Sequence, residues 1–310
     1  MKFITAHDFM PHLDWKAAVA AIRNGHRFAK AETNDSLLGP REASLFTRSA
    51  YAQGSGCGVK VVTIFKDNPH LGLPVEQGIV LFFDEKTGSL KSLLESPLVT
   101  GIKTAADSVC GAVCLARSDS QTLLIVGAGQ MARSVAEAYN ALFPSLKRIM
   151  IWSRRPEQAE NLARELMSLA CPVKAVSDLP GACGEADIIS TVTAACEPVI
   201  HGAWIKPGTH IDLIGAYRPD MREADDNLIG KGRVFVDSYD TTIHHIGELL
   251  LPIQAGVLSE DDVQGDLYAL IAGKCGRQTT GDITIFKNGG GAHLDIMIAR
   301  YITETLAGVQ

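Results

Sequence analysis

A glycine-rich hexapeptide separates an apolar run from a helical pattern near the middle of the sequence. Residues 127–132, GAGQMA, follow the apolar run TLLIV at 122–126 and have the form G-x-G-x-x-A. Gly127 allows a tight turn from strand to helix, Gly129 lets a phosphate approach the backbone, and Ala132 permits close packing of helix on strand. The free N–H groups at the start of that helix favour a pyrophosphate. The motif predicts a dinucleotide site formed by Gly127, Ala128, Gly129, Gln130 and Met131.

A hydroxyl and two guanidinium groups follow the next apolar run. Ser153, Arg154 and Arg155 come directly after RIMIW, at the position where an acidic residue would bind the ribose 2′-hydroxyl of NAD. Arginine can bind a 2′-phosphate through two parallel hydrogen bonds, whereas a carboxylate would repel it. The sequence therefore predicts NADPH as the preferred cofactor and NADH as an accepted one. The alternative is that both arginines are solvated loop charges.

Three cationic residues precede the dinucleotide motif. Arg41 follows a proline, Lys60 lies in the strand-like run GVKVVTIF, and Lys103 lies in TGIKTAA. A lysine buried in a strand can donate a proton or hold a carboxylate, and an arginine can bind a carboxylate through two hydrogen bonds. We predict that the three residues bind a small anionic substrate, with Lys60 as the catalytic group. The alternative is that each is a solvated or paired surface charge.

Apolar runs and helical stretches alternate around the dinucleotide motif. From Gln121 to about Phe286 the runs are TLLIV, RIMIW, VKAV, ADIIST, HIDLI and RVFV. Such runs are typical of strands that are buried on both faces of a parallel sheet, and right-handed crossovers then give a doubly wound fold. We predict a Rossmann-type NAD(P)-binding domain over residues 118–286.

The rest of the chain has a mixed pattern. Hydrophobic periodicity predicts helices at 15–31, 104–116 and 293–307 and strands at 58–65, 78–84 and 88–94. The turn EKTG lets the last two strands pair as a hairpin. We predict that residues 1–117 and 287–310 form an α+β substrate-binding domain. Asn288 and the glycines at 289–291 would bring backbone close to the nicotinamide, unless they only reverse the chain.

Bulk composition excludes several classes of function. The 310 residues are 46% hydrophobic and 21% charged, and the net charge of −6 offers no footprint for nucleic acid or an anionic membrane. The seven cysteines are odd in number and scattered, which fits a reducing cytoplasm, and no basic segment leads into an apolar stretch of signal-peptide length. No histidines, cysteines and carboxylates are spaced as a metal set. We expect a cytoplasmic protein without a metal, nucleic-acid or membrane partner.

Six motifs occur in the order seen in one protein family. They are Pro40-Arg41, GVKVV at 58–62, TGIKTAA at 100–106, the glycine motif at 127–132, GAYRPD at 215–220 and ITIFK at 283–287. Over nearly the whole chain this pattern resembles the ornithine cyclodeaminase/mu-crystallin family. The resemblance implies a homodimer whose first domain supplies the dimer contact and the substrate pocket, with the terminal helix packed on it. It also implies cofactor contacts from Thr104, at a helix start, and from Thr193; Gly215, Tyr217 and Asn288 complete the predicted cofactor-binding set.

The family includes cyclodeaminases, alanine dehydrogenases and imine reductases. Tyr217 occupies a position that resembles an aspartate of ornithine cyclodeaminases, and a phenol does not act as a carboxylate at neutral pH. Lys103 stands where many members have arginine. The segments GAYRPDMREADD and FKNGGGAHLD are most similar to the branch that reduces cyclic imines. The resemblance thus implies reduction of Δ1-pyrroline-2-carboxylate to L-proline, and of Δ1-piperideine-2-carboxylate to L-pipecolate. Ornithine cyclodeamination, alanine dehydrogenation and a non-catalytic, crystallin-like role in NADPH binding are the alternatives.

Overall fold

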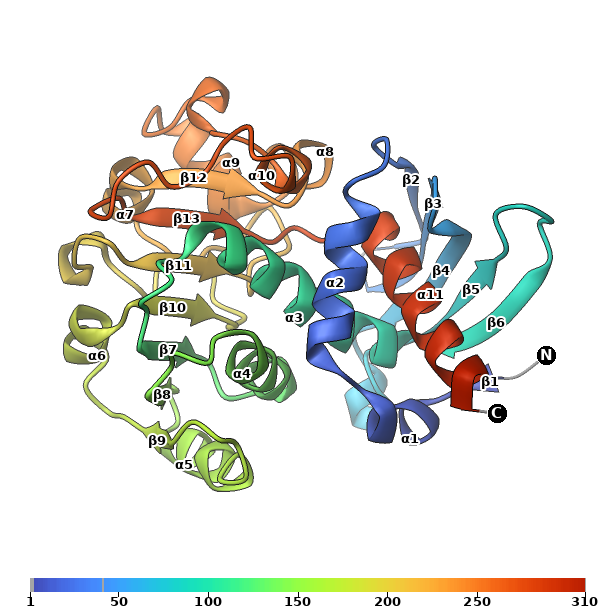
Figure 1. Cartoon of the computed structure of the whole chain (residues 1–310), viewed down its shortest axis with the longest axis horizontal. Coiled ribbons are helices and arrows are strands. Elements are labelled where there is room, and N and C mark those ends of the chain that lie inside the picture. The colour runs from blue at the N-terminus through green and yellow to red at the C-terminus, as the bar shows by residue number, and fades with distance from the viewer. Residues whose placement is uncertain (1–2, 41, 310) are drawn as a thin grey trace. The chain divides into compact units, whose positions relative to one another are not determined.

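The chain divides into two compact units. The computed structural model describes residues 3–40 and 42–309. The first unit is Met1–Lys103 with Gly291–Gln310, and the second is Thr104–Gly290 (Figure 1). Helix α3 (Ser96–Leu115) begins in the first unit and ends in the second.

The first unit is an α+β structure. Its elements are β1 (Phe3–Ile4), α1 (Ala6–Phe9), α2 (Trp15–Gly25), β2 (Glu32–Leu38), β3 (Ala43–Ala52), β4 (Gly56–Phe65), β5 (Glu76–Phe83), β6 (Leu90–Glu95) and α11 (Ala292–Val309), with short 3₁₀ helices at Met10–His12 and Asn68–Leu71. The strands form one sheet in the order β1-β6-β5-β4-β3-β2, antiparallel except for the β1–β6 pair. The predicted hairpin of β5 and β6 is confirmed. The polar sequence of β2, ETNDSLL, gave no strand signal.

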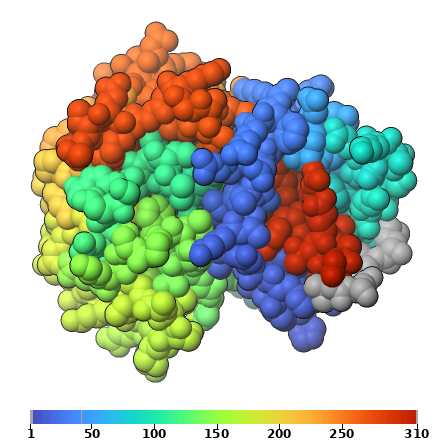
Figure 2. All heavy atoms as spheres, in the orientation of Figure 1, coloured from blue at the N-terminus to red at the C-terminus, as the bar shows by residue number. Residues whose placement is uncertain are grey.

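Helix α11 covers one face of this sheet. It packs on β3 and β4 and lies beside α2, as the red and blue helices show in Figure 1 and on the surface in Figure 2. A Cβ built at Gly58 would approach the Ile296 side chain to 2.6 Å, so the glycine lets helix and strand pack closely. Because side chains alternate along a strand, Lys60 shares the α11 face with Gly58, while Val59 and Val61 point to the opposite face.

The second unit is a doubly wound α/β structure. Its elements after α3 are β7 (Thr122–Val126), α4 (Gln130–Leu142), β8 (Arg148–Trp152), α5 (Pro156–Glu165), β9 (Val173–Ala175), α6 (Leu179–Glu185), β10 (Ile188–Thr191), β11 (His210–Leu213), α7 (Asp226–Lys231), β12 (Arg233–Val236), α8 (Tyr239–Thr242), α9 (Gly247–Gln254), α10 (Leu267–Ile271) and β13 (Thr284–Lys287), with 3₁₀ helices at Gly202–Trp204 and Glu260–Asp262.

All seven strands of this unit are parallel. Their order is β12-β13-β11-β10-β7-β8-β9, and β7, β10, β11 and β13 are buried along their whole length. The chain passes from β7 outward to β9 and then returns to β10 on the other side of β7. This reversal makes a topological switch point between β7 and β10. The predicted Rossmann-type sheet is therefore confirmed.

Helix α3 begins earlier than the sequence predicts. It starts at Ser96, because Pro97 is compatible with the first turn of a helix. Thr104 consequently lies inside the helix, and its predicted place at a helix start was wrong. The boundary between the units falls after Lys103, whereas the sequence-based domains were 1–117 with 287–310 and 118–286. One reason for the earlier boundary is that the second half of α3 packs on the second unit. There Gly111 lies against the Phe286 ring of β13, where a Cβ would come within 2.8 Å.

The same helix has the length and composition of a membrane span. Among the described residues α3 is the one helix that passes this test, with a mean hydropathy of 1.4 in its most apolar window. In the structure 78% of that window is buried inside the protein. Its apolar character is therefore explained by burial in the core.

A buried histidine at the start of β11 gives the fold a defined acid sensitivity. Burial, with a smaller effect of Arg277, lowers the pKa of His210 from 6.5 to about 3. As pH falls below 6.5 the unfolded chain binds a proton that the folded chain does not, so the free energy of unfolding decreases. In His210→Gln we expect this dependence to be shallower by up to about 1.4 kcal/mol per pH unit. Denaturant titrations at several acidic pH values measure the slope. The exposed His245→Gln should keep the parental slope, and an unchanged slope in His210→Gln would contradict the assignment.

Candidate functional site

A cleft lies at the carboxyl ends of three neighbouring strands in the second unit. Beyond the ends of β7, β8 and β10 there is a cavity of about 280 Å³. Three predicted groups line it, namely Gly127 with Ala128, Ser153–Arg155 and Thr193. Open α/β sheets bind ligands beyond the strand ends at the switch point of their strand order, which here lies between the neighbouring strands β7 and β10. We take this cavity as the candidate nucleotide cleft.

The two glycines of the motif have different structural roles. Gly127 has a φ of +129°, and a Cβ built there would lie 2.8 Å from the Val192 carbonyl oxygen, so a side chain would strain the turn. Gly129 is the N-cap of α4, and no heavy atom lies within 4 Å of its Cβ position. No side chain of the described residues caps this helix. The open space beside the first N–H groups of α4 fits a pyrophosphate. Gln130 and Met131 form the first turn of the helix.

Ser153 and the two arginines follow β8 at the edge of the cleft. The backbone N–H of Arg155 donates to Ser153 Oγ at 3.3 Å, which shapes the turn. Arg154 and Arg155 are exposed, and neither forms an ion pair with another described residue. Both guanidinium groups can therefore bind a ligand in the cleft without first leaving an ion-pair partner.

Thr193 and Gly215 are joined by a residue that the sequence analysis did not single out. The buried Glu223 accepts hydrogen bonds from Thr193 N and Oγ1 and from Gly215 N, each at 2.7 Å. These residues follow the adjacent strands β10 and β11. Glu223 belongs to the charged stretch READD, and nothing in that stretch distinguishes a buried acid from a solvated one.

The other predicted cofactor residues do not line the cleft. Asn288 and Thr104 are buried, and the Asn288 amide donates to the Thr104 carbonyl at 3.1 Å and to Ser108 Oγ at 3.0 Å. With both N–H groups used, the amide offers only its oxygen to a ligand. Tyr217 is 61% exposed, and its ring lies 5.6 Å from the Arg218 guanidinium. A cofactor contact from Asn288, Thr104 or Tyr217 stays a prediction.

In the first unit the ammonium group of Lys60 is buried beside two residues that the sequence analysis did not assign. Lys60 Nζ donates to Thr100 Oγ1 at 2.6 Å and lies 3.6 Å from Asp295 Oδ1. The Asp295 carboxylate is 1% exposed and accepts no hydrogen bond from another described residue. Lys60 is thus the cation that compensates this buried charge. The sequence signal for Asp295 was an acid within the apolar helical stretch HLDIMIA.

Lys103 is also buried in the first unit, on α3. Burial, and then the neighbouring His26 and Lys103, lower the pKa of His293 well below its usual range. The His26 and His293 rings meet edge to face at 5.4 Å. His293 is therefore neutral at physiological pH. Arg41 lies outside the described residues, and its role as a carboxylate ligand stays a prediction.

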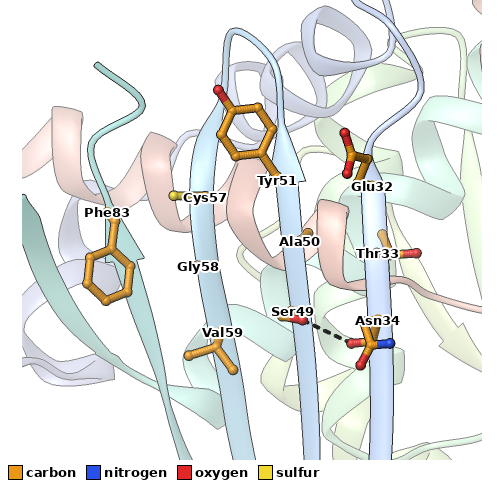
Figure 3. A pocket seen from close by; sticks show the side chains of 10 residues that line it. All are labelled: Glu32, Thr33, Asn34, Ser49, Ala50, Tyr51, Cys57, Gly58, Val59 and Phe83. Atoms are coloured by element: carbon orange, nitrogen blue, oxygen red, sulfur yellow. Dashed lines mark hydrogen bonds between the residues drawn. The ribbon is translucent and has the colours of Figure 1, made fainter. Parts of the chain in front are cut away.

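A shallow pocket lies on the sheet face opposite α11. It measures about 490 Å³ and is formed by β2, β3, β4 and β5 (Figure 3). Tyr51, Cys57, Val59 and Phe83 line it, and Ser49 Oγ donates to the Asn34 carbonyl at 3.2 Å. Lys60 points to the other face, so this pocket is separate from the Lys60 ammonium.

Comparison with known proteins gives matches over nearly the whole chain. The sequence model of the ornithine cyclodeaminase/mu-crystallin family matches residues 15–310. A Δ1-pyrroline-2-carboxylate reductase from Paracoccus denitrificans is 51% identical over 308 residues, which cover 99% of this chain and 98% of that protein. The structure of the Thermococcus litoralis Δ1-pyrroline-2-carboxylate reductase in complex with NADH and L-proline has a TM-score of 0.92 and 28% identity, covering 100% and 98% of the two chains. An archaeal alanine dehydrogenase dimer with bound NAD has a TM-score of 0.91 and 25% identity, covering 99% and 96%.

Proposed function

The chain belongs to the ornithine cyclodeaminase/mu-crystallin family, and on that premise we propose that it is an NAD(P)H-dependent reductase of cyclic imino acids. Its main reaction is the reduction of Δ1-pyrroline-2-carboxylate to L-proline, with the six-membered Δ1-piperideine-2-carboxylate as a second substrate. The observation that carries this proposal is the 51% identity, over 99% of the chain, to a Δ1-pyrroline-2-carboxylate reductase.

The surroundings of Lys60 support a role in protonating the imine. A lysine ammonium has three N–H donors; one is bonded to Thr100 Oγ1 and a second points toward Asp295 Oδ1. The third is left for the substrate, where it keeps the imine nitrogen protonated. A reduced nicotinamide, when bound, supplies the hydride that C2 of the imine requires. Lys103 and Arg41 would hold the substrate carboxylate.

An assay with a panel of substrates tests the reaction. Purified protein is mixed with each cyclic imine and either reduced cofactor, and the absorbance of the reduced nicotinamide is followed. We expect turnover with both imines. Release of ammonia and proline from ornithine without net cofactor oxidation would instead indicate cyclodeamination, and cofactor oxidation only with pyruvate and ammonium would indicate alanine dehydrogenation. NADPH binding without any turnover would indicate the crystallin-like role.

We further propose that NADPH is the preferred cofactor. The support is the pair of exposed arginines at the end of β8, where a carboxylate would select NADH. In Arg154→Asp we expect the ratio of kcat/KM for NADPH to that for NADH to fall on the order of a hundredfold, since a charged hydrogen-bond pair becomes a repulsive one. Arg164→Asp, on the exposed side of α5, is the matched control. An unchanged ratio in Arg154→Asp would mean that the arginine is only a surface charge.

We also propose a homodimer formed through the sheet face opposite α11. Leu45, Tyr51 and Ile79 are exposed there, and Val59 and Val61 lie between them, so the face is more apolar than a solvated sheet surface requires. In a dimer formed through this face about a two-fold axis, Val61 would lie close to the same residue of the second copy or to the residues around it. Light scattering is expected to give about twice 33.2 kDa for the parent and 33.2 kDa for Val61→Lys. Met167→Lys, at an exposed site in the second unit, should stay dimeric, and a dimeric Val61→Lys would reject this face.

We also propose that the reaction takes place in the cytoplasm. The support is that Cys57, Cys171, Cys183, Cys196 and Cys275 are thiols outside any disulfide, and that Cys171 and Cys183 are buried. Burial raises the pKa of Cys183 to about 12, which keeps that group a neutral thiol. Fractionation of cells that express the protein checks the assignment.

A further inference from the structure

The buried carboxylate of Glu223 accepts hydrogen bonds from residues at the ends of β10 and β11, which are neighbouring strands of the parallel sheet. Glu223 Oε1 accepts from Thr193 N and Thr193 Oγ1, both at 2.7 Å. Glu223 Oε2 accepts from Thr191 Oγ1 at 2.6 Å and from Gly215 N at 2.7 Å. A Cβ at Gly215 would lie 2.4 Å from Glu223 Oε1, so the glycine is what lets the carboxylate approach. The Glu223 side chain thus holds in place the part of the nucleotide cleft that Thr193 lines.

A second buried carboxylate holds the backbone of the first. Glu248 accepts from Glu223 N at 2.8 Å and from Ala224 N at 2.9 Å. Burial and then the neighbouring Glu223 raise the pKa of Glu248, and the charge of the buried Lys287 acts in the opposite direction. Two carboxylates and one ammonium group away from water are expensive for stability alone. This arrangement favours a role in fixing the geometry of the cleft.

The hydrogen bond from Thr193 determines what that residue can offer a ligand. A hydroxyl has one proton and two lone pairs. The proton of Thr193 is donated to Glu223, and one lone pair accepts from Ala195 N at 3.3 Å. The second lone pair of the Thr193 hydroxyl is left for a ligand in the cleft. Thr193 can therefore pair with a ligand donor but not with a phosphate oxygen.

We propose that Glu223 is a positioning residue for the dinucleotide, which fixes the Thr193 hydroxyl as an acceptor for a ribose hydroxyl of the cofactor. The inference rests on the proposed nucleotide cleft and deepens it. Both riboses of a dinucleotide carry hydroxyl donors, and phosphates at neutral pH carry few or none. Glutamine at position 223 would turn one oxygen into an NH₂ group that faces a backbone N–H, of Thr193 or of Gly215.

The affinity of the protein for the cofactor, which can be measured in the absence of turnover, tests the proposal. The dissociation constant of NADPH is measured by its fluorescence for the parent, Thr193→Val, Glu223→Gln and the double variant, and thermal unfolding shows that each is folded. We expect each single variant to bind NADPH about tenfold more weakly, as for the loss of one hydrogen bond that the cofactor makes. The double variant should bind little more weakly than either, because both changes remove the same contact. Asp212→Asn is the matched control, since Asp212 is an equally buried carboxylate that bonds to Tyr139 and Ser190, outside the cleft.

Deoxy analogues of NADPH identify the donor. One analogue lacks the 3′-hydroxyl of the adenosine ribose and the other lacks both hydroxyls of the nicotinamide ribose. We expect the parent to bind one of them about tenfold more weakly than NADPH, and Thr193→Val to show no such difference. The proposal is overturned if both analogues bind the parent as tightly as NADPH, or if Thr193→Val and Glu223→Gln keep the parental constant. A parent that binds NADPH and reduces no imine would contradict the proposed reaction but not this inference.

Discussion

Replacement of Lys60 by methionine is expected to lower kcat/KM for Δ1-pyrroline-2-carboxylate on the order of a thousandfold, which is the typical contribution of a positioned proton donor. Methionine fills a similar volume but has no N–H group, so the imine nitrogen loses its donor. The dissociation constant of NADPH should not change, because its predicted ligands lie in the second unit. Steady-state kinetics and a fluorescence titration measure the two quantities.

Lys66→Met is the matched control for this variant. Lys66 lies just beyond β4 and pairs with Glu42 at the surface, so its removal should leave kcat/KM within about twofold. Parental activity in Lys60→Met would contradict the role of Lys60.

The same substitution also leaves Asp295 as a buried charge without its cation. We expect Lys60→Met to lose about 3–5 kcal/mol of stability, as when one partner of a buried ion pair is removed. Lys60→Met combined with Asp295→Asn should recover much of that stability without recovering turnover, because the buried charge is gone but the proton donor is not restored. Recovery of both would mean that Lys60 has only a structural role.

Replacement of Gly129 by alanine is expected to abolish most dinucleotide affinity while the protein stays folded. No heavy atom lies within 4 Å of its Cβ position, so stability should change by no more than about 1 kcal/mol, as for an altered helix N-cap. The same Cβ would occupy the place of the pyrophosphate, and the dissociation constant of NADPH should rise on the order of a hundredfold.

Gly127→Ala should behave differently. Its φ of +129° and the contact with Val192 predict a loss of about 1–3 kcal/mol of stability along with the loss of binding. Gly184→Ala, on α6, is the control, since a Cβ there meets its nearest neighbour at an ordinary 3.7 Å. Parental NADPH affinity in Gly129→Ala would show that the motif does not hold a phosphate.

The predictable part of the fold is the part with strong periodicity. The runs TLLIV and HIDLI are buried along their whole length, and that burial is what makes a parallel strand readable from sequence. Strand β2 was missed because ETNDSLL is almost entirely exposed and so has no hydrophobic alternation. Helix α3 was started too late because its first turns contain proline, threonine and glycine, which weaken the helical signal.

The site was predictable where backbone geometry requires a residue type. Gly127 has a positive φ that favours glycine, so this backbone requirement is visible in the sequence as a glycine of the motif. Glu223 and Asp295 were not predicted, because their importance lies in burial, and an acid in READD or HLDIMIA looks the same whether it faces water or the core. Only the tertiary structure brings Asp295 to Lys60 and Glu223 to Thr193.

One hydride transfer, from the reduced nicotinamide to C2 of the cyclic imine, is expected to give the amino acid. The protein is incubated with Δ1-pyrroline-2-carboxylate and NADPH that carries deuterium at both positions of C4 of the nicotinamide, and the product is analysed by NMR and chiral chromatography. We predict L-proline with deuterium at C2. Proline without deuterium, D-proline, or no proline at all would exclude this hydride transfer as the reaction of the protein.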